Sequence, residues 1–232
     1  MQIFTGTSGF SYKEWKGEFY PSDLKNADML GYYATRLPAV EINNTFYRLP
    51  RVSVLESWAD AVPPEFQFIL KASRMITHFK RLNDVKDVTG YLIETARVLG
   101  ERLGVILFQF PPNFRKDADR LRDFVTILPD DIRFTFEFRH NEWADDEVFD
   151  VLASKNIALC TADAHGEPTE IVPTADWGYL RLRRSDYGEV EQEDWARRIS
   201  DQAWNAVYVM FKHEDDAAGP NMAKEFLGRL TG

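Results

Sequence analysis

Several runs of the chain alternate between apolar and polar residues and then end in a charged side chain. In residues 133–139, three phenylalanines alternate with Thr135, Glu137 and Arg139, and in residues 179–183 two leucines alternate with Arg181 and Arg183. Side chains alternate between the two faces of a β-strand, so each run carries its charges on the face opposite the leucines or phenylalanines. The pattern predicts strands whose last polar positions point into a shared space.

Eight such strands can be placed, and segments with helical spacing separate most of them. The expected strands are residues 2–5, 39–42, 66–71, 105–108, 133–138, 158–162, 179–182 and 207–211. Apolar residues three and four positions apart predict helices between them, most clearly in residues 88–99, and the last of them in residues 222–230 closes the chain. Residues 166–176 lack a convincing helical pattern, so the sixth strand–helix unit is expected to be degenerate.

This order of elements predicts an α/β fold. Strands that alternate with helices favour right-handed crossovers and a parallel sheet that helices cover. The 232 residues fall in the range of a single (β/α)8 barrel. We therefore expect a TIM-type barrel that forms one domain over residues 1–232. A doubly wound open sheet is the alternative, but no glycine-rich phosphate turn follows the first strand.

Composition limits the classes of partner and the location. The net charge of -9 disfavours non-specific binding along nucleic acid. No apolar run approaches the roughly 20 residues that span a bilayer, and the N-terminus lacks the pattern of a signal peptide. The single cysteine, Cys160, lies in an apolar run, which predicts a buried thiol and a reducing compartment. We expect a cytoplasmic protein without a membrane partner.

Polar side chains follow the carboxyl ends of the expected strands. If the apolar phase of each strand packs on helices, the other phase faces the barrel axis. The residues then expected at the mouth are Glu41, Asn43, Lys71, Gln109, Glu137, Arg139, Asp163, Arg181, Arg183 and Lys212. Five of them are cations and three are anions, which favours a pocket for phosphate or carboxylate held by arginine. A structural ion-pair network is the alternative, although burying so many charges for stability alone is unfavourable.

All four histidines also come soon after expected strands, at His78, His140, His165 and His213. Imidazole suits acid–base chemistry or metal ligation there. A mixed nitrogen and oxygen metal site would draw on the last three histidines with Glu41, Glu137 or Asp163. No HxH, HExxH or paired-cysteine spacing supports such a site, so we expect no cofactor and keep a divalent metal as a minor alternative.

Aromatic residues follow several strand ends. Phe46, Tyr47, Trp143 and Tyr187 could stack on a sugar or a base of the ligand. Packing over the barrel mouth would explain them equally well.

Taken in order, several segments resemble the family called domain of unknown function 72, or YecE-like proteins. The matching blocks are Gly6-Thr7-Ser8-Gly9-Phe10-Ser11-Tyr12 with Trp15, Phe19-Tyr20-Pro21, Val40-Glu41-Ile42-Asn43-Asn44-Thr45-Phe46-Tyr47-Arg48-Leu49-Pro50, Lys71-Ala72-Ser73-Arg74 with Ile76-Thr77-His78, Phe108-Gln109-Phe110-Pro111-Pro112, and Glu137-Phe138-Arg139-His140 with Trp143. The resemblance runs from the first strand to the last helix. It implies a TIM-type barrel, and it makes Arg48, Arg74 and His78 further candidates for ligand binding.

The family resemblance supplies no established activity. Its barrel is similar to those of endonuclease IV and sugar isomerases, which suggests a phosphodiester or sugar substrate by analogy of fold. This chain has Arg181-Leu182-Arg183-Arg184 where many members have Arg-Leu-His-Gly, and Lys212-His213-Glu214-Asp215 where many have Asn-Asn-Asp. The ligand chemistry on that side is therefore expected to differ, and an endonuclease-like zinc site needs more histidines than the matching places offer.

Two functions remain open from the sequence. The first is an enzyme acting on a phosphorylated sugar- or nucleotide-like compound, by phosphodiester hydrolysis or isomerisation. The second is a non-catalytic module that binds an anionic metabolite or a single-stranded nucleic-acid end. The expected catalytic residues are Glu41, Lys71, Glu137 and His140. The expected binding residues are Asn43, Tyr47, Arg48, Arg74, His78, Gln109, Arg139, Trp143, Asp163, Arg181, Arg183, Lys212 and His213.

Overall fold

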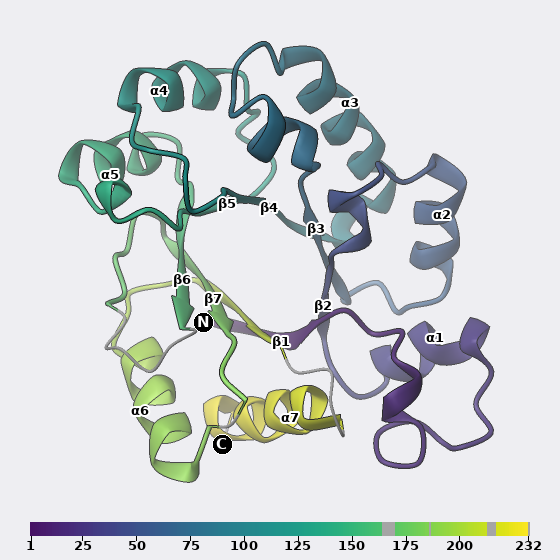
Figure 1. Ribbon diagram of the computed structural model, residues 1–232. Coiled ribbons are helices and arrows are strands. Elements are labelled where there is room, and N and C mark those ends of the chain that lie inside the picture. The colour runs from purple at the N-terminus through teal and green to yellow at the C-terminus, as the bar shows by residue number, and fades with distance from the viewer. Residues whose placement is uncertain (164–169, 186, 213–216, 232) are drawn as a thin grey trace.

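Eight parallel strands pair in chain order and close into a barrel in the computed structural model, which describes residues 1–163, 170–185, 187–212 and 217–231 (Figure 1). The strands are β1 (Gln2–Ser8), β2 (Ala39–Ile42), β3 (Gln67–Lys71), β4 (Leu103–Gln109), β5 (Phe134–Glu137), β6 (Ala158–Asp163), β7 (Trp177–Leu182) and β8 (Ala206–Phe211). β8 pairs with β1 and so removes the sheet edges. The prediction of a TIM-type barrel is confirmed, with all eight strands near their expected positions.

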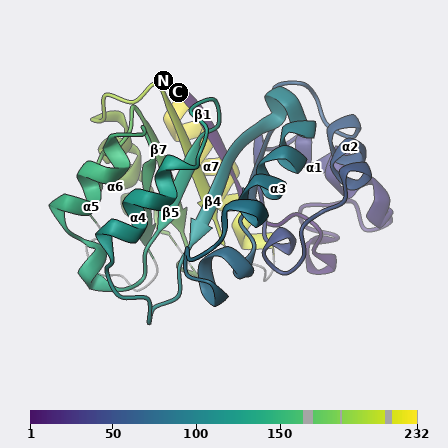
Figure 2. The ribbon, with the colours of Figure 1, turned by 90° about the horizontal axis from the view of Figure 1, so that it is seen from above.

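Helices surround the ring of strands in both views (Figures 1 and 2). The α-helices are α1 (Met29–Ala34), α2 (Val52–Asp60), α3 (Lys86–Ala96), α4 (Ala118–Thr126), α5 (Asp146–Ala153), α6 (Glu189–Ser200) and α7 (Ala218–Thr231). Shorter helical segments are η1 (Lys13–Trp15), η2 (Asn26–Asp28), η3 (Asn44–Phe46), η4 (Met75–Phe79), η5 (Arg97–Arg102) and η6 (Asn141–Trp143). Residues 170–176, the described part of the connection from β6 to β7, contain no helix, in agreement with a degenerate sixth unit.

Two of the helices begin where an aspartate accepts a hydrogen bond from one of their first N–H groups. Asp117 accepts a hydrogen bond from the backbone of Arg120 at the start of α4, and Asp145 accepts one from the backbone of Glu147 at the start of α5. Within the described residues, no helix is both long and apolar enough to cross a membrane.

Two apolar layers hold the barrel. The outer layer packs leucines and phenylalanines of the strands against the helices, with Phe108, Phe136 and Leu180 fully buried in it. The inner layer fills the barrel axis with one residue of each alternating pair, such as Ile69, Leu107 and Tyr179. The inner phase is apolar at the amino ends of the strands and polar at their carboxyl ends. The charged residues of the inner phase therefore lie at the carboxyl ends of the strands.

Cys160 belongs to the inner layer and is buried, as predicted. Burial, followed in size by the negative charge of Glu137, raises the pKa of its thiol well above the usual value. A thiol in this environment is a packing residue and not a nucleophile.

Candidate functional site

A cavity of about 210 Å³ opens at the carboxyl ends of the strands and is lined almost entirely by polar side chains. Its cations are Lys71 of β3, Arg139 after β5, Arg181 of β7, Arg183 after β7 and Lys212 after β8. The other lining residues are Tyr12, Asn43, Phe46, Tyr47 and Gln109. We call this cavity the mouth pocket. The structure thus brings together nine of the ten residues that the strand pattern placed at the mouth, counting the buried Glu41 and Glu137 below.

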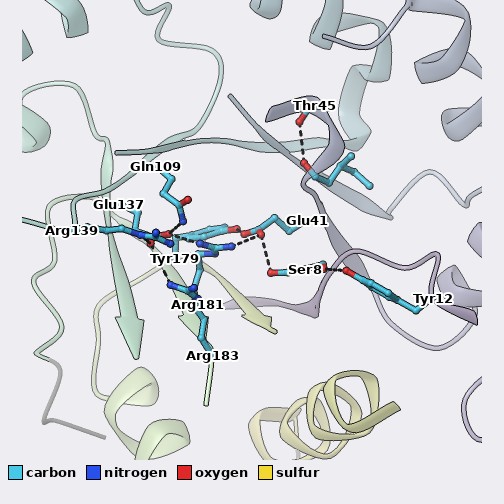
Figure 3. A network of polar contacts seen from close by, with 11 residues as sticks. Ser8, Tyr12, Glu41, Thr45, Gln109, Glu137, Arg139, Tyr179, Arg181 and Arg183 are labelled. Atoms are coloured by element: carbon cyan, nitrogen blue, oxygen red, sulfur yellow. Dashed lines mark hydrogen bonds and ion pairs between the residues drawn. The ribbon is translucent and has the colours of Figure 1, made fainter. Parts of the chain in front are cut away.

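Arg181 lies at the centre of the network under the pocket, between two buried carboxylates (Figure 3). Its Nη2 donates to Glu41 Oε1 at 2.8 Å, and its Nη1 donates to Glu137 Oε2 at 2.5 Å. The three side chains are between 0 and 3% exposed, so solvent screens these ion pairs little. Both carboxylates raise the pKa of Arg181 further, against the effect of burial. The guanidinium is therefore permanently charged and fixed in place.

Glu41 receives two more hydrogen bonds from neighbouring strands. Ser8 Oγ at the end of β1 donates to Oε1 at 2.8 Å, and Tyr179 Oη of β7 donates to Oε2 at 2.6 Å. Burial acts to raise the pKa of this carboxyl, but the charge of Arg181 and these donors outweigh it and hold the pKa below its usual value. Glu41 is therefore an anion whose two oxygens are both occupied.

Glu137 is held in the same way from the opposite side. Gln109 Nε2 donates to Oε2 at 2.8 Å, Arg139 Nε donates to Oε1 at 3.1 Å, and Arg183 Nη1 lies 3.8 Å from Oε1. Burial would raise the pKa, but Arg181 and Arg139 lower it to about 2. A carboxylate with so low a pKa and so many donors is a weak base at neutral pH. The geometry favours an electrostatic role for both glutamates over the acid–base role expected from the sequence.

Lys71 has the opposite character. Burial, followed by the positive charge of Arg181, lowers the pKa of its ammonium to about 8, while Glu41 and Glu137 act in the other direction. The Nζ lies 4.3 Å from the centroid of the Phe46 ring, and within the described residues Lys71 makes no ion pair. A group that lines the pocket and titrates near neutral pH is suited to proton transfer.

The pocket has more positive than negative charge. Among the described residues, the five lining cations face the two carboxylates of the network, which leaves an excess of three positive charges. Nε of Arg181 and Nε of Arg183 are buried and have no hydrogen-bond partner within the described part of the chain. Buried N–H donors of this kind are normally paired, so the two arginines keep an unused capacity to donate.

Two other predicted residues, Arg74 and His78, lie beside the mouth pocket at η4 but are not part of its lining. The Arg74 guanidinium lies over the rings of Tyr47 and Phe79, 5.4 and 5.3 Å from their centroids. His78 packs edge-on against Phe46, and burial together with the charges of Lys71 and Arg139 lowers its pKa. Tyr47 is 66% exposed and also lines the pocket, so its ring is accessible to a ligand.

The expectation that Asp163 points into the mouth is wrong. On β6 the inner layer contains Ala158, Cys160 and Ala162, so Asp163 lies on the opposite, helix-facing phase. On this strand the inner phase is apolar and the polar residues Thr161 and Asp163 share the helix-facing phase, so the polar positions did not mark the inner face. The inward phase contains small side chains because Ala162 pairs in register with Arg181, whose guanidinium occupies that part of the barrel.

Trp143 and His140 also lie away from the pocket. Trp143 is 1% exposed, stacks on Phe138 with centroids 4.2 Å apart and donates from Nε1 to the Phe114 carbonyl, so the expectation that it contacts a ligand is wrong. His140 caps η6, with Nδ1 accepting the backbone N–H of Glu142, and it is absent from the pocket lining. An aromatic ring packs where its apolar surface is removed from water. The position of Trp143 after a strand does not by itself show where that place is.

The remaining predicted residues either lie away from the pocket lining or lie outside the described residues. Arg48 is exposed and does not line the pocket. His165 and His213 lie outside the described residues. Tyr187, which also follows a strand end, is 5% exposed and belongs to the outer apolar layer. Within the described residues, no group of three or more His, Cys, Asp or Glu side chains could hold a metal ion.

Sequence reasoning missed three residues of the site. Ser8 and Tyr179 hold Glu41, and Tyr12 closes one side of the pocket. Tyr179 shares the strand phase of Arg181, so the alternation that identified the arginine also contained this signal. Ser8 was missed because β1 continues three residues beyond its expected end.

The family model described as "Protein of unknown function DUF72" matches residues 4–232, and the chain belongs to this family. Among curated proteins it is similar to the UPF0759 protein YunF of Bacillus subtilis, with 23% identity over 98% of this chain and 94% of that protein. It is also similar to the UPF0759 protein YecE of Escherichia coli K12, with 28% identity over 61% of this chain and 50% of that protein.

Solved structures of the same family have the same fold. A DUF72 family protein from Thermotoga maritima superposes with a TM-score of 0.85 and 25% identity over the whole of both chains. One from Enterococcus faecalis gives a TM-score of 0.78 and 18% identity, over all of this chain and 96% of that one. The likeness supports the barrel and carries no activity with it.

Proposed function

We propose that the mouth pocket binds a phosphate-containing anion and that the protein is an enzyme acting on a phosphorylated sugar- or nucleotide-like compound. The observation that carries this proposal is the gathering of five cations around the mouth pocket, one of which, Arg181, also has a buried Nε without a partner among the described residues. A buried, charged N–H donor next to four further cations favours an anion with several acceptor oxygens.

The carboxylates explain how such a site can exist before the ligand arrives. Cations gathered without partners repel one another and lose hydration, which is costly in a protein interior. Glu41 and Glu137 hold Arg181 by ion pairs, and Glu137 also contacts Arg139 and Arg183. Preorganised cations of this kind stabilise negative charge without rearrangement during a reaction.

Lys71 is the residue best suited to move a proton in this pocket. Its pKa of about 8 allows it to donate a proton at neutral pH and to accept one in return. We propose it as the general acid–base in place of Glu41 and Glu137, and the arginines as the groups that stabilise charge. The reaction class, hydrolysis of a phosphodiester or isomerisation of a sugar phosphate, is proposed from the fold, which hosts both.

A non-catalytic module that binds an anionic metabolite or a single-stranded nucleic-acid end is the second candidate. The observation in its favour is that hydrogen bonds and ion pairs occupy the oxygens of both buried carboxylates, so neither is suited to proton transfer. Lys71 is then the one residue suited to it among the described lining of the pocket, whereas acid–base catalysis commonly uses two groups. The exposed Tyr47 ring at the rim fits stacking on a base in this case.

Isothermal titration with inorganic phosphate at low salt tests the binding step. We expect Arg183→Met to weaken binding about tenfold or more, because a hydrogen bond to a charged group contributes roughly 1.5–3 kcal/mol. Arg197→Met, on the exposed face of α6, is the matched control and should bind as the wild type does. Absence of phosphate binding by the wild type, or equal loss in both variants, would refute the proposal.

Turnover separates the two candidate functions. Lys71→Arg keeps a positive charge in the pocket but cannot release a proton at neutral pH. In an enzyme that uses Lys71, this variant should bind phosphate and lose turnover of phosphodiester and sugar-phosphate substrates. A wild type that binds phosphate but converts none of these substrates would support the binding module.

A further inference from the structure

A second cavity of about 310 Å³ adjoins the mouth pocket on the side of β1 and β2. We call it the side pocket. Tyr12 and Asn43 line both cavities, so these two side chains form a shared wall. The side pocket is also lined by two further aromatic residues, Phe10 and Trp58, and by two further polar residues, Ser11 and Asn44.

The two cavities differ in chemistry. The described lining of the side pocket contains no charged residue, whereas five cations line the mouth pocket. The rings of Phe10, Tyr12 and Trp58 offer apolar surface. The side-chain amide groups of Asn43 and Asn44 make no hydrogen bond within the described residues and can both donate and accept. The side pocket therefore suits an uncharged group that has an apolar face and a hydrogen-bonding edge.

Tyr12 is fixed at the boundary of the two cavities. Its hydroxyl donates to the carbonyl of Ser8 at 2.8 Å, and the Ser8 hydroxyl donates in turn to Glu41 (Figure 3). Gly9 permits this arrangement, because it has a φ of +104° and a Cβ there would lie 2.5 Å from Tyr12 Oη. The wall is therefore connected directly to the network that organises the cations.

We propose that the two cavities form one binding site for a two-part ligand, with a phosphate in the mouth pocket and an uncharged polar ring in the side pocket. The inference rests on the proposed function, because it needs the mouth pocket to bind phosphate. A cavity of about 150 Å³ holds benzene, so the 310 Å³ of the side pocket accommodates a sugar ring or a nucleobase. Both have an apolar face and polar edges, and the test distinguishes them.

Isothermal titration with four probes tests the inference: inorganic phosphate, ribose 5-phosphate, glucose 6-phosphate and adenosine monophosphate. We expect at least one organic phosphate to bind ten times more tightly than inorganic phosphate. Preference for either sugar phosphate identifies a sugar as the occupant of the side pocket, and preference for adenosine monophosphate identifies a base. The inference is overturned when none of the three binds more tightly than inorganic phosphate.

Variants of the side pocket locate the gain in affinity. Asn44→Ala removes one amide, and Ser11→Phe fills the cavity from an exposed position. Both should bring the affinity of the organic phosphate down toward that of inorganic phosphate and leave inorganic phosphate binding unchanged. Asn221→Ala, at an exposed position of α7 outside both linings, is the matched control.

The outcomes separate the two proposals. Failure of inorganic phosphate to bind refutes the proposed function, and the inference falls with it. Phosphate binding that Arg183→Met weakens, together with organic phosphates that Asn44→Ala and Ser11→Phe do not affect, overturns the inference alone.

Discussion

Replacement of Arg181 by methionine tests whether the buried network stabilises the fold. The change removes ion pairs with Glu41 and Glu137, which are 0 and 1% exposed. Two buried carboxylates then lose their shared cation, while the remaining donors stay in place. Removing one partner of a buried ion pair costs about 3–5 kcal/mol. For a domain of this size each kcal/mol lowers the melting temperature by about 2–4 °C, so we expect a fall of roughly 6–20 °C.

The pH dependence identifies the cause of this loss. In the wild type both carboxyl pKa values lie below the usual 4.5, with that of Glu137 at about 2. Their contribution to stability is therefore present above pH 4.5 and is lost as the pH falls toward 2. In the variant, burial without Arg181 raises both pKa values, so the carboxyls become neutral at mildly acidic pH. The difference in stability between the two proteins should be largest at pH 7 and smaller at pH 4.

Urea and thermal unfolding at pH 7 and pH 4 measure both effects. Arg139→Met is the control, because Arg139 pairs with Glu137 from a side chain that is 32% exposed and should cost no more than about 1 kcal/mol. The triple variant Glu41→Gln, Glu137→Gln, Arg181→Met removes the charges together and should recover much of the loss. An unchanged midpoint for Arg181→Met, or a loss that is the same at both pH values, would refute the reasoning.

Three further predictions follow from single residues. Lys71→Met should raise the free energy of unfolding at pH 7 by at most about 3 kcal/mol. The pKa of Lys71 in the folded protein, about 8, lies below the usual 10.5, so the stability of the wild type should rise with pH between these values. Urea denaturation from pH 7 to 10.5 should therefore show the stability difference between variant and wild type becoming smaller. Trp143→Ala should lower the free energy of unfolding in urea by about 3–5 kcal/mol and leave the affinity for phosphate unchanged. Weaker phosphate binding without a loss of stability would show instead that Trp143 contacts the ligand. Gly9→Ala should cost about 1–2 kcal/mol, and a melt equal to that of the wild type would contradict the strain inferred at its positive φ.

The alternation of apolar and polar residues was sufficient to predict the barrel. Each strand repeats the same local preference, and eight repeats separated by helical segments leave few ways to bury the apolar faces. The same alternation placed Lys71, Glu137 and Arg181 at one end of the barrel, because parallel strands all end on the same side. These predictions depend only on local periodicity, and the structure confirms the barrel and the convergence.

The alternation was insufficient where the polar residues of a strand lie on its outer phase, or where a residue lies in the segment after its strand. Asp163 ends a strand whose polar residues lie on the helix-facing phase, and Trp143 lies in η6 after β5, where its Nε1 donates to the Phe114 carbonyl. In these cases the direction of the side chain depends on the neighbouring strands and helices. The size of Arg181 next to Ala162 is one such influence, and it comes from a different part of the chain.

The sequence by itself determined the fold class, the end of the barrel that carries charge and the predominance of cations there. Only the tertiary structure decided what those charges do. Hydrogen bonds from Ser8 and Tyr179, more than thirty residues away in the chain, occupy Glu41 and keep it ionised, whereas Lys71 is buried beside Arg181 and has its pKa lowered. Such shifts depend on distances of a few ångströms and on the exclusion of water, which arise only when distant segments of the chain pack together.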